Sequence, residues 1–98
     1  MSMPHYILLL NWTDQGIRNV KDTAKRAAAA RKAFERAGAK PQIFYTFGQY
    51  DIVGIAEAPN DEVLLRLALA TASLGNVRTT TLKAWTEAEA AKVIAKLP

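Results

Sequence analysis

Hydrophobic and polar residues follow one another along the chain in a pattern that predicts strands alternating with helices. The first apolar run, "HYILLLNW", has the length of a strand and covers residues 5–12. Apolar residues then recur at helical spacing up to Gly38, with Thr13 suited to be the N-cap and a local break expected at Asp22. Gly38 is a helix stop, so the pattern begins with a strand followed by a long helix.

Two further strands and a second helix are predicted in the middle of the chain. The segments "KPQIFYTF" (40–47) and "YDIVGIAEA" (50–58) have strand rhythm and are joined across Gly48 and Gln49, where glycine suits a tight hairpin. Asn60 is expected to cap a helix that ends at Gly75.

The last part of the chain completes one domain over residues 1–98. "NVRTTTLKAW" is rich in β-branched residues and predicts a fourth strand, and Thr86 with Glu89 forms a capping box before a last helix. The order is βαββαβα. It predicts an α+β fold of the ferredoxin-like type, with a four-stranded antiparallel sheet in the order 4-1-3-2 and both crossover helices on one face.

The first and third strands are apolar on both of their faces, although the helices can cover only one. In the first strand, Ile7 and Leu9 alternate with Leu8 and Leu10. Two arrangements would bury the second face of the sheet. Either the last helix folds back over it, or two copies of the chain pack face to face, and the second arrangement hides more of the sheet.

Composition narrows the chemistry. Half of the 98 residues are hydrophobic and 22% are charged, as in a globular domain. The chain has no cysteine and a single histidine, His5, so we expect no metal site and no cofactor. The apolar run is much shorter than the roughly 20 residues of a membrane span, and we expect a soluble cytoplasmic protein with no membrane partner.

Positive charge is concentrated in the first helical region. Residues 18–40 contain eight basic side chains against two acidic ones: Arg18, Lys21, Lys25, Arg26, Arg31, Lys32, Arg36 and Lys40, with Asp22 and Glu35. Such a cluster would attract polyanions, but it has no interleaved aromatic residues and is typical of a solvated helix face. We therefore expect no nucleic-acid partner.

Three separated stretches, "NWTDQGIRNVKD", "FGQYDIVGIAEAPND" and "SLGNVRTTTLKAW", resemble the GYD domain family over essentially the whole chain. The glycine, tyrosine and aspartate of that family correspond to Gly48, Tyr50 and Asp51, with one residue inserted after the glycine. Thr23 and Ala24 stand where the family would have a proline. The resemblance implies a fold similar to the dimeric α+β barrels, which include cofactor-free oxygenases and small-molecule-sensing regulatory domains, and it implies no particular activity.

The expected topology brings a set of polar residues to one edge of the sheet, beside the start of the first helix. This polar rim comprises Asn11, Thr13, Gln15, Gly16, Thr46, Tyr50, Asp51, Asn76 and Arg78, with Lys21 further along the helix. Gly16 would leave backbone N–H groups unshielded, and a small anionic or carbonyl ligand would fit there. In the structural alternative, Thr13 is only a cap and Asp51 serves the hairpin or pairs with Arg78.

Two functions of different class fit these observations. The first is a homodimeric module that binds a small molecule or regulates, with ligand contacts in the polar rim. The second is a cofactor-independent enzyme of the dimeric α+β barrel type, oxygenase-like or isomerase-like, in which Tyr50, Asp51, His5 and Lys21 are the candidates for proton transfer. The observation that would distinguish the two functions is whether a cavity under the first helix is lined by Tyr50 or filled by apolar side chains such as Phe47.

Overall fold

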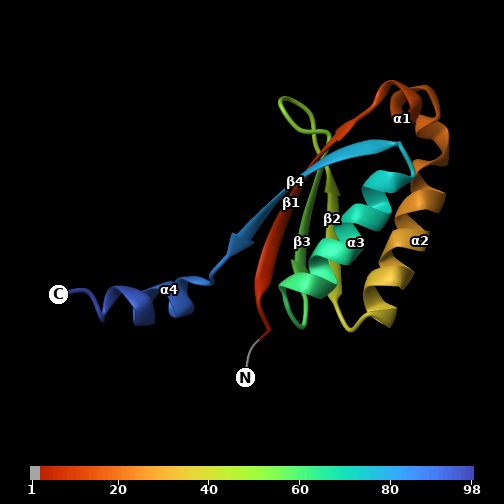
Figure 1. Ribbon diagram of the computed structural model, residues 1–98. Coiled ribbons are helices and arrows are strands. Elements are labelled where there is room, and N and C mark those ends of the chain that lie inside the picture. Colours follow the sequence, from red (N-terminus) through yellow and green to blue (C-terminus); the bar gives the residue numbers. More distant parts are fainter. Residues whose placement is uncertain (1–2) are drawn as a thin grey trace.

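One four-stranded antiparallel sheet organises the molecule, and the computed structural model describes residues 3–98 (Figure 1). The strands are β1 (His5–Trp12), β2 (Lys40–Tyr45), β3 (Ile52–Glu57) and β4 (Val77–Ala84). They lie in the order β2-β3-β1-β4, so β1 and β3 are central. This confirms the α+β class, the ferredoxin-like arrangement and the strand order predicted from the sequence.

The helices are α1 (Asp14–Arg18), the short 3₁₀ helix η1 (Val20–Asp22), α2 (Thr23–Arg36), α3 (Asp61–Ser73) and α4 (Glu87–Ile94). The expected local break at Asp22 is therefore larger than predicted, because a separate 3₁₀ turn divides α1 from α2. The caps agree with the sequence. The side chain of Asn60 accepts a hydrogen bond from the Val63 N–H at 2.9 Å, and Thr86 and Glu89 form a capping box.

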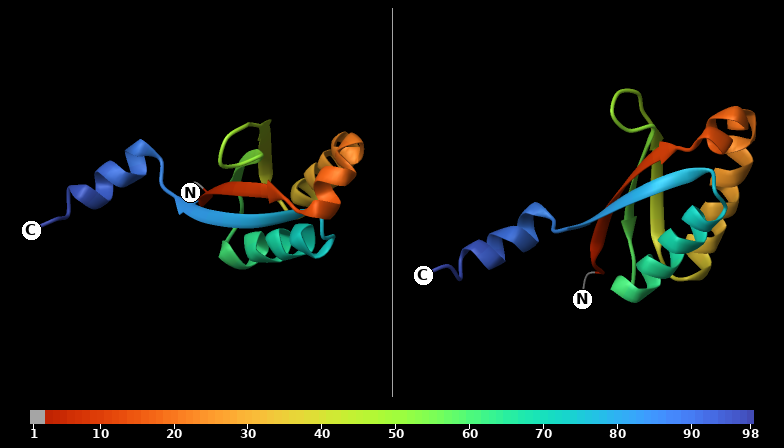
Figure 2. Two further views of the ribbon diagram at one scale, coloured as in Figure 1. Left: turned by 90° about the horizontal axis from the view of Figure 1, so that it is seen from above. Right: turned by 45° about the horizontal axis from the view of Figure 1, so that its top comes forward.

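Both α2 and α3 lie on the same face of the sheet (Figures 1 and 2). Alternate side chains of β1 point towards them, and Tyr6, Leu8 and Leu10 are buried there. Phe34 from α2 and Leu64 from α3 complete this core from the helix side. The core thus uses one face of the sheet only.

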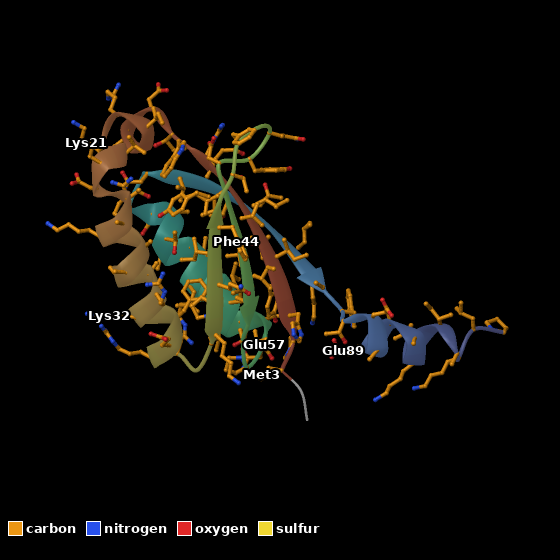
Figure 3. The ribbon with its side chains drawn as sticks, turned by 180° about the vertical axis from the view of Figure 1, so that it is seen from behind. Met3, Lys21, Lys32, Phe44, Glu57 and Glu89 are labelled. Carbon is orange, nitrogen blue, oxygen red and sulfur yellow. The ribbon has the colours of Figure 1, made fainter. Side chains whose placement is uncertain are left out.

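The opposite face, which Figure 3 shows towards the viewer with Phe44 labelled, is apolar and uncovered. This open face is formed by Ile7, Leu9, Phe44, Val53, Ile55 and Leu82, which are brought to one side by the strand register. Phe44, Ile55 and Leu82 are 45%, 41% and 46% exposed. The prediction that β1 and β3 are apolar on both faces is therefore confirmed.

The last helix does not cover the open face. After β4 the chain leaves the body of the domain, and α4 projects away from the sheet (Figures 1 and 2). Its apolar side chains Val93 and Ile94 are about 60% exposed, at 59% and 62%. Of the two arrangements that the sequence allowed, the folded-back helix is not the one observed.

Candidate functional site

The polar rim lies at one end of the sheet, where the ends of β1 and β2 meet the starts of β3 and β4 (the top of Figure 1). The segment 13–19, the hairpin loop 46–51 and the turn 74–76 meet there. Hydrogen bonds join the segment 13–19 to the turn 74–76, and others join the hairpin loop to the end of β1. The topology argument from the sequence therefore places most of the rim residues correctly as neighbours.

Asp51 joins the start of β3 to the end of β1. Its Oδ2 accepts a hydrogen bond from the Trp12 backbone N–H at 2.8 Å, and its own N–H donates to the Leu10 carbonyl at 2.9 Å. The Thr46 N–H donates to the Asp51 carbonyl at 2.9 Å, which closes the hairpin. No ion pair joins Asp51 to Arg78. The carboxylate thus accepts from the end of β1, whereas the hairpin is closed by the Asp51 backbone carbonyl, so the observed structural role of the side chain differs from both roles that the sequence suggested.

Thr13 and Gly16 fix the first helix against the turn before β4. Thr13 Oγ1 donates to the Gly75 carbonyl at 2.6 Å and accepts from the Gly16 N–H at 3.0 Å. The Gly16 N–H, which was expected to be open to an anion, is thus occupied by the cap. A Cβ atom at position 16 would lie 1.9 Å from the Asn76 carbonyl oxygen, so only glycine permits this close approach.

Amide side chains complete the links within the rim. Gln15 Nε2 donates to the Leu74 carbonyl and to Asn76 Oδ1, both at 3.0 Å. Asn11 Nδ2 reaches the Gln49 carbonyl in the hairpin loop at 2.7 Å. These side chains hold the ends of the strands together, and their bonding capacity is already partly used.

Two rim side chains have polar groups without such bonds. Within residues 3–98, neither the Tyr50 hydroxyl nor the Arg78 guanidinium makes a hydrogen bond or an ion pair, although the Tyr50 carbonyl accepts from Thr46 Oγ1 at 2.7 Å. Lys21 is exposed on η1, away from the hairpin loop (Figure 3). Phe47 is 99% exposed and fills no cavity. The rim that remains available to a ligand is therefore smaller than the predicted set.

A second polar cluster, at the opposite end of the sheet, was missed by the sequence reasoning. The Tyr6 hydroxyl donates to Asp61 Oδ1, and Lys83 Nζ lies 3.0 Å from Oδ1 and 3.1 Å from Oδ2 of the same carboxylate. Burial, together with the hydrogen bond and the charge of Asp61, raises the pKa of Tyr6 to about 12. The Tyr6 hydrogen bond and then Lys83 hold the pKa of Asp61 below its usual range.

His5 lies between two carboxylates near the same end. Its Nε2 is 3.8 Å from Glu57 Oε1 and its Nδ1 is 3.9 Å from Glu89 Oε1. In the part of the chain that the structure describes, no three histidine, cysteine or acidic side chains are grouped closely enough to bind a metal ion. The same residues include no helix with the length and apolar character of a membrane span.

The sheet, its two crossover helices and the polar rim define a ferredoxin-like α+β domain. The family model of the GYD domain matches residues 6–94, and the chain belongs to this family. It is 33% identical over 84 residues to a protein of Thermus thermophilus named "Glutamine synthetase and cystathionine beta-lyase binding protein", with 84% of this chain and 88% of that protein covered. The resemblance inferred from the three sequence stretches is thereby confirmed.

Proposed function

We propose that this protein is a homodimeric regulatory module that acts by binding other proteins, and that its polar rim takes a small ligand. The observation that carries this proposal is the uncovered apolar face of the sheet. Large contiguous apolar patches are rare on monomers and mark interaction surfaces. A second copy offers the same patch, so a two-fold symmetric contact would cover both faces at once.

The size of the open face fits such a contact. Its six apolar side chains come from all four strands, so the seam extends across the sheet. A stable interface buries about 1,200–2,000 Å² in total, and two stacked sheets pack about 10 Å apart with their side chains interdigitated. The apolar side chains of the exposed α4 lie beyond the edge of the sheet. In the proposed dimer, the second copy would also come close enough to contact them.

The outer side of α3 remains free in this dimer and supports the protein-binding role. Leu65 and Leu69 are 59% and 60% exposed and lie one helical turn apart, on the side of the molecule away from the open face. Paired apolar residues on a helix surface are a common recognition element. The Thermus thermophilus relative is named for binding two enzymes, and we propose that this chain likewise binds partner enzymes.

The small-ligand role belongs to Tyr50 and Arg78. They come from the hairpin loop and from β4, on the edge where Asn11, Thr13, Gln15 and Asp51 fix the backbone. A guanidinium and a phenol hydroxyl together suit a small anionic or carbonyl compound. Gly16 makes no direct contact with the ligand in this proposal, because its N–H is bonded to Thr13, and Lys21 contributes only long-range charge.

Two matched variants test the proposal. Ile55→Lys places a charge in the centre of the open face, whereas Leu65→Lys places the same charge on the outer side of α3. Light scattering across a dilution series should show a dimer for the unmodified chain and for Leu65→Lys, and a monomer for Ile55→Lys. Binding to purified glutamine synthetase and cystathionine beta-lyase, measured by interferometry, should be lost in Leu65→Lys. A 10.7 kDa monomer at every concentration would contradict the dimer.

The partner part of the proposal fails separately. If the unmodified chain binds neither enzyme, or if Leu65→Lys binds both as tightly as the unmodified chain does, α3 is not the partner surface. The ligand part is tested by Tyr50→Phe and Arg78→Gln, which should keep the dimer. A small ligand retained by the purified unmodified protein should be lost in both variants.

A further inference from the structure

A groove of about 270 Å³ runs between α2 and α3 on the outside of the domain. Its walls are apolar and come from Ala27, Ala30 and Ala33 on α2, from Leu67 and Ala70 on α3, and from Leu74 directly after α3. The alanines of α2 have only a methyl group as side chain. Such small side chains leave space between the two helices.

The groove continues towards the sheet. A smaller cavity of about 70 Å³ adjoins it and shares Leu10, Ala30 and Phe34 with it. Along α2 the groove extends from Thr23 to Phe34, which is about 16 Å at 1.5 Å per residue. Its volume lies just below the range of roughly 300–1,000 Å³ that is usual for small-molecule sites. The space suits a narrow, extended apolar chain.

One end of the groove is polar. Thr23 and Arg26 from the start of α2 line it there together with Asn76. Arg26 Nη1 donates to the Asn19 carbonyl at 2.9 Å, whereas Nη2 is buried and has no hydrogen-bond partner within residues 3–98. In the same residues no carboxylate forms an ion pair with Arg26.

A buried guanidinium nitrogen without a partner is costly, because it has lost its hydration and gained no acceptor. Buried polar groups in native proteins nearly always have a partner, so an exception calls for an explanation. Arg26 lines the neighbouring groove, so a rotation of its side chain would turn Nη2 towards an acceptor held there. Since the guanidinium fork matches the two oxygens of a carboxylate, a carboxylate is the acceptor that fits best.

We propose that this groove binds a monocarboxylate with an unbranched apolar tail, of the medium-chain fatty acid class. The carboxylate lies on Arg26 at the polar end, near Thr23 and Asn76, and the tail extends along Ala27, Ala30 and Ala33. The site shares Asn76 with the polar rim but includes neither Tyr50 nor Arg78, and it lies away from the open face. It depends neither on dimer formation nor on partner enzymes, so it can be tested when those proposals fail.

Octanoate is the test ligand. Two comparison compounds separate its parts, since 1-octanol has the apolar tail without the charge and acetate has the charge without the tail. Titrations of the full-length ¹⁵N-labelled chain should show amide shifts concentrated in α2 and α3. Octanoate should bind at least about tenfold more tightly than either comparison compound, because each lacks one of the two contributions.

Matched variants test separately the charge of Arg26 and the free volume of the groove. Arg26→Gln should weaken octanoate binding by about tenfold or more, whereas Lys25→Gln, which removes the same charge from an exposed site on the same helix, should leave it unchanged. Ala30→Leu should fill the groove and abolish binding while the melting temperature is kept or raised. Ala28→Leu, on the exposed side of α2, should bind normally.

Several outcomes would overturn the proposal. Equal affinity for octanoate and octanol would remove the role of Arg26, and so would unchanged binding in Arg26→Gln. Amide shifts in the polar rim alone, or normal binding in Ala30→Leu, would place the ligand elsewhere. If Ala30→Leu changes the molar mass in light scattering without changing octanoate affinity, the groove holds a helix of a second copy.

Discussion

Asp51 and Trp12 are joined by a hydrogen bond of 2.8 Å from the Trp12 backbone N–H to Asp51 Oδ2. The bond crosses from the start of β3 to the end of β1, just beyond the last paired residues of these two strands. A carboxylate in this position acts as a charged acceptor for a backbone donor that would otherwise lack a strand partner. Tyr50, its neighbour in sequence, has no comparable bond through its hydroxyl to any residue of 3–98.

This contrast predicts different effects of Asp51→Asn and Tyr50→Phe on stability. Asp51→Asn should lower the free energy of unfolding by roughly 1–3 kcal/mol, because a charge-assisted bond becomes a neutral one and the amide can place a donor against a donor. Tyr50→Phe should change it by less than about 0.5 kcal/mol. Urea denaturation followed by circular dichroism measures both. A neutral Asp51→Asn with a destabilised Tyr50→Phe would reverse the two assignments.

Gly16 gives a second stability prediction, because the Asn76 carbonyl oxygen approaches this residue too closely for any side chain. Gly16→Ala would bring a Cβ atom to 1.9 Å from that oxygen, and since both groups belong to the backbone, one segment must move. We expect a loss of about 3 kcal/mol or more in the free energy of unfolding. Gly54→Ala is the control, since its Cβ would meet Leu8 and Gln42 only at ordinary contact distances of 3.6 Å and beyond. Equal melting temperatures for the two variants would contradict the prediction.

The fold was predictable because local signals and long-range burial agreed. The apolar run of β1, the caps at Asn60 and Thr86 and the glycine at the end of α2 each mark an element, and right-handed crossovers then leave few topologies. The segment between α1 and α2 was less well predicted. The choice between a continuous helix and a 3₁₀ turn at Val20–Asp22 depends on small differences in backbone energy that no residue pattern reports.

The sequence predicted which residues of the site lie close together, but not how their polar groups are hydrogen-bonded. Strand order alone brings Thr13, Asp51 and Asn76 to one edge, whereas the use of their hydrogen-bonding groups depends on distances of a few tenths of an ångström. The Tyr6 and Asp61 pair shows the limit most clearly. They stand 55 positions apart in the chain, and Tyr6 reads as an ordinary apolar strand residue. Only the packing of α3 on β1 and β4 brings the carboxylate to the hydroxyl and to Lys83.

The basic side chains of α2 predict a negative result with nucleic acids. Lys25, Arg31, Lys32 and Arg36 are exposed, and Lys32 extends outwards from the helix (Figure 3). No aromatic side chain of α2 is exposed to stack on a base, since Phe34 is buried in the core. Fluorescence anisotropy with labelled duplex and single-stranded DNA should detect no binding at physiological salt. Tight binding that weakens steeply with added salt would show that this helix is a polyanion site.

The Tyr6, Asp61 and Lys83 cluster predicts how stability depends on pH. The pKa of Tyr6 is raised to about 12 in the folded protein from an ordinary value of 10.0, so between these values the folded chain holds a proton that the unfolded chain has lost. Its contribution to stability is therefore complete below pH 10 and falls as the pH rises towards 12. The pKa of Asp61 is lowered, so its contribution is present above its ordinary value and is lost as the pH falls below it.

Tyr6→Phe isolates the alkaline part of this dependence, because the variant keeps both Asp61 and Lys83. At neutral pH the variant should be less stable by about 1 kcal/mol, the usual value of one hydrogen bond. As the pH rises from 10 to 12, the unmodified chain should lose stability more steeply than the variant, and the difference between the two should shrink. Urea denaturation at a series of pH values measures this difference directly. A difference that stays constant up to pH 12 would mean that Tyr6 ionises as it does in the unfolded chain, and that its bond to Asp61 does not favour the protonated phenol.

Asp61→Asn extends the same comparison to acid pH. The unmodified chain should lose stability as Asp61 becomes protonated, and the variant should lack this part of the loss.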